Sequence, residues 1–345
     1  MNLPTAHGLP LGNAAFKLVP ADFVVHELMP VVPQGDGEHL WLEIEKTGWN
    51  TEDVALWLAS AAGVHRLSVG YSGLKDKHAI TRQWFSIHLP GKVDPVLDCP
   101  EGLTLLAAQR HRRKLNRGTH RANHFDIRLQ QVCADRDAID LRLQQIARLG
   151  VPNYFGPQRF GRGAGNSERG KQWLAGQGEA PRKRALRGMW LSAVRSELFN
   201  RVLALRVEQG CWNTAIEGDV FQPANSRGLF HSALDEDLLQ RIERAEVHPT
   251  APMPGAGGML PLGRAAALEQ QALAESGAVI AGLEKQGVEH ARRATRMMVQ
   301  KLQWQWQDHA LTLRMTLPVG GFATVVLAEL LSTGTTHNTE STTQQ

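Results

Sequence analysis

At the stretch VPNYFGPQRFGRGAG, Val151 to Gly165, the character of the chain changes. Its glycine, proline and aromatic residues are typical of a loop. Before it, apolar and polar side chains alternate, and after it the apolar side chains recur at helical spacing. The sequence therefore predicts a region with more strand than helix up to Val151 and a mostly helical region beyond it.

The region before Val151 consists of predicted strands interrupted by two predicted helices. In DFVVHEL, for example, β-branched and aromatic residues favour a strand. Asn50 can cap the first helix, and Gly150 can end the second. The predicted strands are 22–28, 39–48, 65–73, 82–90, 103–111 and 123–132, and the predicted helices are 50–63 and 136–150.

The region after Val151 is predicted to be helical at 167–176, at 189–210 and from Arg264 towards Gln300, with a Gly/Pro-rich interruption from Pro252 to Gly263. A strand pattern returns from Gln303 and ends in a short helix. A sheet, a helical block and a returning sheet are the order that an inserted domain produces. The tail 332–345 has almost no apolar side chains to bury, so we expect it to be disordered.

Length and composition indicate a globular protein of the cytoplasm. The chain has 345 residues, of which 42% are hydrophobic, enough for two domains or for one domain with a large insertion. It contains no apolar run of membrane-spanning length, and its N-terminus lacks the pattern of a signal peptide. We therefore expect no membrane association.

Metal and cofactor sites are not indicated. Cys99, Cys133 and Cys211 are far apart, and the 14 histidines are scattered without metal-ligand spacing. The glycines near Gly161 match neither the dinucleotide-binding nor the phosphate-loop pattern. We expect neither a metal nor a cofactor.

Positive charge is concentrated in one run. The net charge is +4, and RHRRKLNRGTHR, Arg110 to Arg121, contains six Arg/Lys residues, two histidines and no acid. Six cations without an acid would repel one another unless an anion bound them, although an ordinary solvated loop remains the alternative. We predict phosphate binding by Arg110, Arg112, Arg113, Lys114 and Arg117.

The segment SGLKDKHAIT, Ser72 to Thr81, places Asp76 between Lys75 and Lys77 in a predicted turn between strands. Neighbouring cations lower the pKa of a carboxylate, and an ionised carboxylate can act as a nucleophile or base. An idle surface turn would have the same charges. The charge pattern by itself does not decide between the two.

Several segments together resemble one family, the TruD family of tRNA pseudouridine synthases. The resemblance extends from about Lys17 to Leu331 and is most specific where KDKHA and NYFGPQRFG occur in the same chain. The segments that carry it, in order, are DFVVHEL, GLKDKHAITRQWFSI, HRRKLNRGTHRANHF, GVPNYFGPQRFG, WLSAVRSELFN and GGFATVVLAEL.

The resemblance implies an α+β fold. It implies a pseudouridine-synthase catalytic domain, residues 1–150 and 298–331, with a mixed, mainly antiparallel sheet and flanking helices. A largely helical α/β insertion domain, residues 151–297, would interrupt it. The implied reaction converts a uridine of tRNA, typically uridine 13 in the D arm, to pseudouridine without a cofactor.

The resemblance also assigns site residues. Asp76 matches the catalytic aspartate. The residues that match substrate-contacting or nearby basic positions are Phe23, Asn123, Phe125, Phe322, Lys17 and Lys75. We expect Lys75 or Lys17 to keep Asp76 charged. Ala122 replaces a family glycine, which would strain the turn if that position needed a positive φ.

Three mechanistic routes are open to Asp76: addition to the sugar C1′, addition to the uracil C6, or removal of a proton from the sugar. The target uridine would have to leave its stack, and the aromatic residues would hold the flipped base while Asn123 reads its edge. A catalytically silent RNA-binding or RNA-folding protein is the alternative, and it would not need Asp76. A nucleoside hydrolase would want a second carboxylate or a metal cluster. We expect a monomer.

Overall fold

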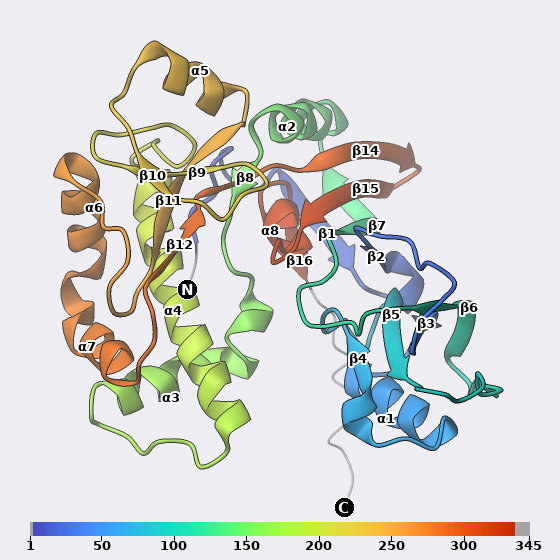
Figure 1. The fold of residues 1–345 in the computed structure, drawn as a ribbon. Helices are drawn as coiled ribbons and strands as arrows, with labels where there is room; N and C mark the ends of the chain where they lie inside the picture. The colour runs from blue at the N-terminus through green and yellow to red at the C-terminus, as the bar shows by residue number, and fades with distance from the viewer. Residues whose placement is uncertain (1–2, 335–345) are drawn as a thin grey trace, which may run out of the picture. The chain divides into compact units, whose positions relative to one another are not determined.

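The computed structural model of the chain describes residues 3–334 and divides into two compact units. The sheet unit comprises the described residues of Leu11–Ile139, Val299–Val319 and Leu331–Gln345. The helical unit comprises the described residues of Met1–Pro10, Asp140–Met298 and Gly320–Leu330. Each unit is therefore assembled from three separate segments of the chain (Figure 1).

The sheet unit contains ten strands and one helix of its own, α1 (Thr51–Ala61). Two short 3-10 helices, Pro20–Asp22 and Arg66–Ser68, precede β2 and β4. The strands are β1 (Gly12–Phe16), β2 (Phe23–Leu28), β3 (His39–Lys46), β4 (Val69–Tyr71), β5 (Ile80–His88), β6 (Leu103–His111), β7 (Ala122–Ala134), β14 (Gln300–Gln307), β15 (Ala310–Pro318) and β16 (Ser332–Gly334).

These strands form one mixed, mainly antiparallel sheet. Its main path is β14-β15-β7-β2-β5-β3-β6, while β1 pairs with β7 and β16, and β4 pairs with β5. Two of these pairings, β2 with β5 and β1 with β16, are parallel. The returning segment joins the first sheet through β15 and β7, where Leu313 lies opposite Ile127. The α+β class and the mixed sheet predicted from the sequence are thus confirmed.

The strands form where alternation lets one face be buried. In β3 the inward positions Leu40, Leu42 and Ile44 are almost fully buried. They pack with Val54 and Leu58 of α1 into the core of this part of the sheet unit. Burial of each such side chain favours folding by about 1.5 to 3 kcal/mol.

The helical unit combines six helices with six short strands. A sheet of four strands has the order β10-β9-β11-β12, and β13 pairs with β8. The elements are β8 (Val151–Pro152), α3 (Gly165–Leu174), α4 (Arg184–Glu208), β9 (Val220–Pro223), β10 (Phe230–His231), α5 (Glu236–Glu243), β11 (Val247–Met253), α6 (Gly263–Leu273), α7 (Gly277–Lys285), β12 (Ala291–Ala294), β13 (Arg296–Met297) and α8 (Ala323–Ala328); 3-10 helices cover Pro157–Arg159, Arg162–Ala164 and Ala274–Ser276.

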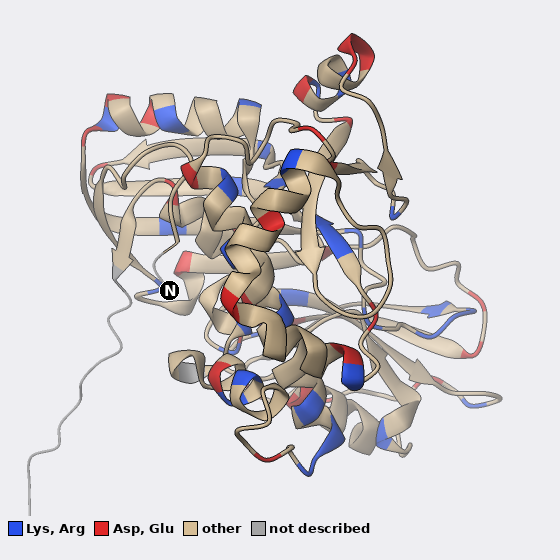
Figure 2. Cartoon of the chain, turned by 90° about the vertical axis from the view of Figure 1, so that its left-hand side faces the viewer, with Lys and Arg blue, Asp and Glu red and all other residues tan. Residues whose placement is uncertain are grey.

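Helix α4 is the central element of this unit and packs against α3, α6 and β11 (Figure 1). Its buried residues include Val194, Leu198 and Val202, which recur every four positions along one face. Basic and acidic residues both occur along α3 and α4, where blue and red turns of the ribbon are interspersed (Figure 2). Lys171 and Arg201 both pair with Glu197, so part of the positive charge of these helices is balanced.

Helix α2 (Arg136–Leu149) spans the boundary between the units and ends at Gly150, as predicted. Gly150 has φ +75°, and a Cβ there would lie 2.5 Å from the carbonyl oxygen of Met297. Only glycine combines that backbone conformation with so close an approach. The helix stop is thus also a packing contact with β13.

Two predicted elements are wrong. The segment after α7 was expected to stay helical towards Gln300, but it forms β12 and β13. Its sequence lacks a helical apolar stripe, and Arg292 and Arg296 are buried in strand conformation. The tail expected to be disordered from 332 begins instead with β16, paired to β1, and its remainder lies outside the described residues.

The compact units also divide the chain differently from the predicted domains. Residues 1–10, 140–150 and 320–330 belong to the helical unit, although they lie within the ranges predicted for the catalytic domain. The functional division at 151 and 297 stays a prediction. Among the described residues, no helix is long and apolar enough to span a membrane.

Candidate active site

Asp76 lies in the turn that joins β4 to β5 in the sheet unit. Neighbouring segments fix the backbone of this turn. The Lys75 amide donates to the Thr51 hydroxyl at 3.0 Å, and the Gly48 amide donates to the Lys77 carbonyl at 3.0 Å. The turn is thus anchored to the segment that connects β3 to α1.

The Asp76 carboxylate is paired with Lys17 and remains accessible. Lys17 Nζ donates to one carboxylate oxygen, and the His78 amide donates to the other at 2.9 Å. The side chain of Asp76 is 35% exposed, so a ligand can reach it. Burial raises the pKa of Asp76, but the hydrogen bonds from Lys17 and His78 outweigh it and hold the pKa below its usual value. The carboxylate is therefore ionised at neutral pH.

Lys17 connects this carboxylate to a cluster of aromatic rings. Its Nζ lies 4.1 Å from the centroid of the Phe23 ring, within the range of a cation–π contact. Phe23 is 5.9 Å from Phe125 and 5.4 Å from Phe16, centroid to centroid. Lys17 itself adopts φ +60°, a left-handed conformation that is unusual for a residue other than glycine. The structure thus brings Lys17, Phe23, Phe125 and Asp76 together.

Lys75 has a different partner. Its Nζ donates to Glu27 Oε1 at 2.5 Å, and both side chains are buried. The other Glu27 oxygen accepts a hydrogen bond from the Trp84 amide. Burial raises the pKa of Glu27 above its usual value, although Lys75 opposes this shift. Of the two lysines expected to keep Asp76 charged, Lys17 is the one that pairs with it.

Asn123 is the second residue of β7 and lies close to His120. Asn123 Nδ2 lies 3.4 Å from His120 Nε2, and the Asn123 side-chain oxygen is buried without a hydrogen-bond partner among the described residues. Burial, with a smaller effect of the Lys75 charge, lowers the pKa of His120 to about 4. Ala122 is not among the described residues with positive φ, so replacement of the family glycine introduces no backbone strain there.

Sequence reasoning missed Lys46, which is completely buried at the end of β3. Its Nζ donates to the backbone carbonyls of Trp49 and Asp76, each at 2.8 Å. Burial lowers the pKa of Lys46 to about 8. A signal existed, because Lys46 and Glu27 both occupy inward positions in strands whose other inward side chains are apolar.

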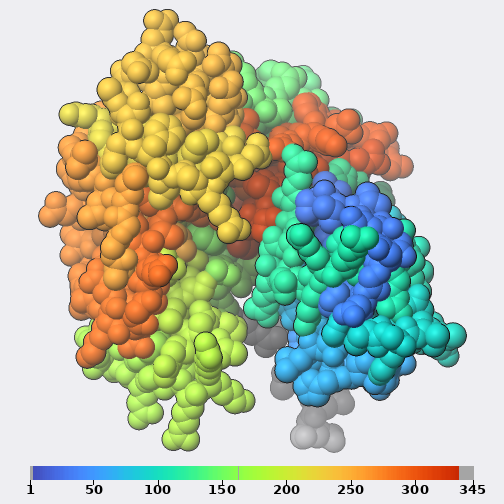
Figure 3. All heavy atoms as spheres, viewed as in Figure 1, coloured from blue at the N-terminus to red at the C-terminus, as the bar shows by residue number. Residues whose placement is uncertain are grey.

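The basic run does not lack acidic partners, contrary to the reasoning from its sequence. Arg110 pairs with Asp94 at 2.6 Å, and Arg112 pairs with Asp36 at 2.6 Å. The segment before β3, in blue, lies beside the blue-green segment that follows β6 (Figure 3). The acids come from loops distant in sequence, so no anionic ligand is needed to explain these two arginines.

The other predicted phosphate ligands are less engaged. Arg113 and Arg117 are exposed, and no ion pair joins either of them to a described residue. Lys114 Nζ donates to the carbonyl of Leu67. Of the five predicted ligands, Arg113 and Arg117 are thus the most available to an external anion.

Phe322 belongs to the helical unit, where it immediately precedes α8. It is half-buried and lies 6.0 Å from the Phe155 ring, centroid to centroid. Phe155 follows β8 in the Gly/Pro/aromatic stretch Val151 to Gly165. That loop is therefore also part of the surroundings of a predicted substrate-contacting residue.

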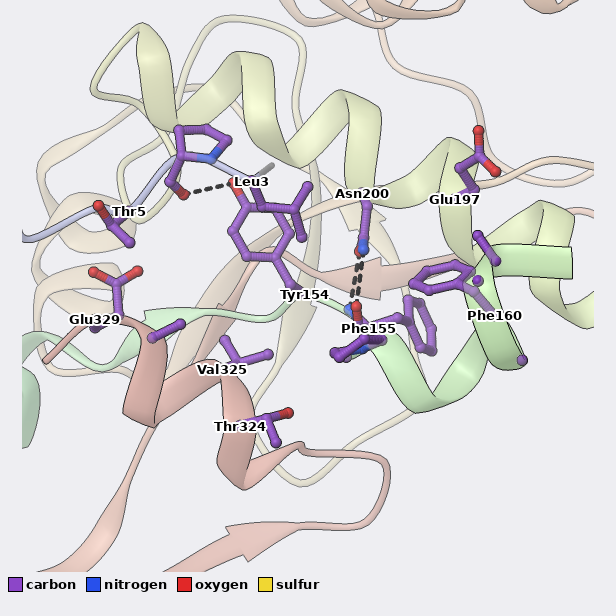
Figure 4. Close-up of a pocket in the computed structure, with 17 residues that line it drawn as sticks. Leu3, Thr5, Tyr154, Phe155, Phe160, Glu197, Asn200, Thr324, Val325 and Glu329 are labelled. Carbon is purple, nitrogen blue, oxygen red and sulfur yellow. Dashed lines mark hydrogen bonds between the residues drawn. The ribbon is translucent and has the colours of Figure 1, made fainter. Parts of the chain in front are cut away.

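The helical unit also encloses a pocket of about 550 Å³ (Figure 4). The pocket is mainly apolar, and its polar side chains are largely occupied. Asn200 exchanges hydrogen bonds with the Phe155 backbone, the Tyr154 hydroxyl donates to Pro4, and Glu329 accepts from the Ala6 amide. These groups hold the pocket walls together and leave little for recognition of a ligand.

No metal centre is apparent in residues 3–334, where no group of three or more His, Cys, Asp or Glu side chains is arranged to hold an ion.

Comparison with known families matches almost the whole chain. A family model described as tRNA pseudouridine synthase D (TruD) matches residues 10–180 and 180–330. The tRNA pseudouridine synthase D of Pseudomonas aeruginosa (strain LESB58) is 47% identical over 343 residues, covering 98% of this chain and 96% of that protein. The protein of the same name from Pseudomonas syringae pv. syringae (strain B728a) is 45% identical over 341 residues, covering 98% and 97%.

A solved structure has the same fold. The crystal structure of a TruD chain from Methanosarcina mazei superimposes with a TM-score of 0.70 at 20% sequence identity. The match covers 93% of this chain and 94% of that chain.

Proposed function

We propose that this chain, which belongs to the TruD family of tRNA pseudouridine synthases, converts uridine 13 in the D arm of tRNA to pseudouridine with Asp76 as the catalytic nucleophile. The protein is a pseudouridine synthase, an isomerase that acts on tRNA. The position in tRNA and the role of Asp76 are the parts that we propose. We further propose that it acts in the cytoplasm as a monomer and without a cofactor.

The observation that carries the proposal is the Lys17–Asp76 pair beside an aromatic cluster. Breaking the C1′–N1 bond and rejoining uracil through C5 requires a group that holds the intermediate while the base turns. A carboxylate that adds to C1′ or C6, or takes a proton from the sugar, must be ionised and accessible on every route. Asp76 meets both conditions.

Neighbouring residues would bind the flipped nucleotide. Phe23 and Phe125 are each only 7% exposed, so they would contact an unstacked base through a small part of their surface, whereas full stacking on an aromatic ring contributes roughly 1 to 3 kcal/mol per base. Asn123 has an amide oxygen that lacks a donor, which a uracil imide N–H could supply. Phe322 would contact the substrate from the helical unit. Lys17 would keep Asp76 ionised, and its remaining ammonium N–H groups would donate hydrogen bonds to the substrate.

The RNA backbone would be bound by the basic run. Among the predicted ligands, Arg113 and Arg117 are available, whereas Arg110 and Arg112 would have to share their charge with Asp94 and Asp36. Lys114 would join them if its bond to Leu67 were exchanged for a phosphate. The segment 151–297 would act as the insertion domain and 1–150 with 298–331 as the catalytic domain.

The test is release of tritium from C5-labelled uridine in a tRNA transcript, with no cofactor added. Wild-type protein should release tritium, and a transcript carrying cytidine at position 13 should not support release. Asp76→Asn should abolish release while binding tRNA almost as tightly as wild type. Asp36→Asn is the matched control, because Asp36 is also an exposed carboxylate paired with a cation, and it should keep full activity.

Release at the wild-type rate by Asp76→Asn would exclude Asp76 as nucleophile. Tight tRNA binding by wild type without any release would favour the silent RNA-binding alternative. Release that persists with cytidine at position 13 would move the target to another uridine.

A further inference from the structure

Two arginines of the helical unit approach the same aromatic ring. The guanidinium carbon of Arg293 lies 4.3 Å from the centroid of Phe155, and that of Arg159 lies 5.6 Å from it. Phe322 contacts Phe155 edge to face. Two positive charges thus share one small region beside Phe322.

Each guanidinium is oriented by neutral partners. Arg293 donates to the Asn153 carbonyl, to the Asn153 side-chain oxygen and, at 2.9 Å, to the Gly320 carbonyl. Arg159 donates to the hydroxyls of Ser192 and Ser196. In both, Nη1 makes no hydrogen bond to a described residue, so each arginine retains an N–H group for a further acceptor.

Neither arginine of this pair has a carboxylate partner among the described residues, whereas two buried arginines of the unit do. Arg206 pairs with Asp219, and Arg292 pairs with Glu269. Arg159 is exposed and Arg293 is half-buried, so a ligand can reach both. Without a carboxylate nearby, the two neighbouring cations repel each other.

The electrostatics of Arg293 agree with this. Burial, and then the charge of Arg159, lower the pKa of Arg293 to about 9. For Arg195 and Arg296, which likewise lack a carboxylate partner, burial alone lowers the pKa. An anion would relieve the repulsion between Arg159 and Arg293.

We propose that Arg159 and Arg293 form a binding site for one phosphate of the RNA backbone, adjacent to Phe322. Arginine suits this ligand, because its fork of N–H groups matches the oxygens of a phosphate. The site would anchor the sugar-phosphate chain next to the flipped uridine. This inference rests on the proposed function, since it takes tRNA as the ligand.

The experiment uses tRNA transcripts in which single phosphates flanking uridine 13 are replaced by uncharged methylphosphonates. One of these replacements should weaken binding to wild-type protein. The double variant Arg159→Gln/Arg293→Gln should bind unmodified tRNA as weakly as wild type binds the sensitive methylphosphonate tRNA. That methylphosphonate should not weaken tRNA binding by the variant any further. Its log–log dependence of affinity on salt should be shallower by about 0.7 to 0.9, the value for one phosphate.

Two controls separate phosphate binding from a structural role. Arg195 is half-buried in the same unit and bonded to the carbonyls of Met253 and Glu289, so Arg195→Gln should leave the salt dependence unchanged. The double variant Arg159→Lys/Arg293→Lys keeps both charges and should retain the salt dependence. Thermal melting of each variant reports any loss of fold.

Three results would overturn the inference. They are an unchanged salt dependence in the double Gln variant, additive losses from the variant and the methylphosphonate, or no sensitive phosphate near uridine 13 in wild type. The test for a sensitive phosphate near uridine 13 uses wild-type protein, so its result is valid even if the variants fold poorly. Wild-type protein that releases tritium and yet gives one of these results would exclude this site alone. Failure of wild type to release tritium would overturn the function and this inference with it.

Discussion

At the scale of single residues, the charge state of Asp76 depends on Lys17. Lys17→Met removes the hydrogen bond and charge that lower the Asp76 pKa, so the pKa should rise. Because the carboxylate must be ionised, the acid limb of the activity profile should move to higher pH. The measurement is single-turnover tritium release from pH 4 to 9. Lys77→Met, which removes an exposed lysine from the same turn, should leave the limb in place.

An acid limb that does not move in Lys17→Met would mean that another group keeps Asp76 ionised.

Single residues also mark how far the sequence could predict the site. The KDKHA motif identified Asp76, but it could not show which lysine pairs with it. Lys17 is 59 positions away from Asp76 and Glu27 is 48 away from Lys75, so both pairings depend on how the strands are ordered. Adjacency in sequence suggested Lys75, whereas the fold turns that side chain to Glu27.

At the scale of elements, Lys46 joins the end of β3 to the turn that carries Asp76. Lys46→Met would remove the donor from the carbonyls of Trp49 and Asp76, and because both hydrogen bonds are part-buried, each loss should cost about 1 kcal/mol. We expect a lower melting temperature and a lower kcat with a nearly unchanged KM for tRNA, because the turn that positions Asp76 is loosened.

Calorimetry and steady-state kinetics test this role of Lys46. A variant that loses stability but keeps the wild-type kcat would show that Lys46 supports the fold without positioning Asp76.

Elements with strong patterns were predictable, and those held by tertiary contacts were not. The alternation in β3 and the spacing in α4 come from side chains that face a core, so the sequence displays them. In β12, Arg292 is buried because it bonds to Thr250 and Glu269 on other elements. Such a strand has no apolar signature. The acids that pair with Arg110 and Arg112 were missed for the same reason.

At the scale of the whole molecule, each unit buries a neutral histidine that makes stability sensitive to acid. The pKa values of His120 in the sheet unit and His248 in the helical unit are each lowered to about 4, mainly by burial. His248 Nδ1 accepts a hydrogen bond from Arg296, so it carries no proton. Between pH 6.5 and 4 the unfolded chain binds a proton that the folded chain excludes, so stability falls as the pH falls.

For His248 this loss amounts to roughly 3 kcal/mol between pH 7 and pH 4. His248→Gln can still accept the Arg296 hydrogen bond but cannot titrate, so it should lose about that much less stability over the same interval. Urea unfolding at the two pH values measures the difference. Equal losses in wild type and His248→Gln would show that this histidine is already protonated in the folded protein.

The division into units could be predicted only in outline. A sheet interrupted by a helical block follows from the change of pattern at Val151, but the placement of residues 1–10 and 320–330 in the helical unit does not. These segments are fixed by contacts such as that of Glu329 with the Ala6 and His7 amides. No local sequence pattern predicts contacts between residues so far apart in the chain.

The pairing of β1 with β16 has a consequence for biosynthesis. Asn13 lies opposite Ser332, so the first strand acquires this neighbour only after nearly the whole chain has been translated. The chain also passes from one unit to the other five times, at 10/11, 139/140, 298/299, 319/320 and 330/331. Neither unit can therefore be completed while its later segments are still on the ribosome. Contacts between residues so distant in sequence form slowly, and the nascent protein must stay unaggregated until its last strand emerges.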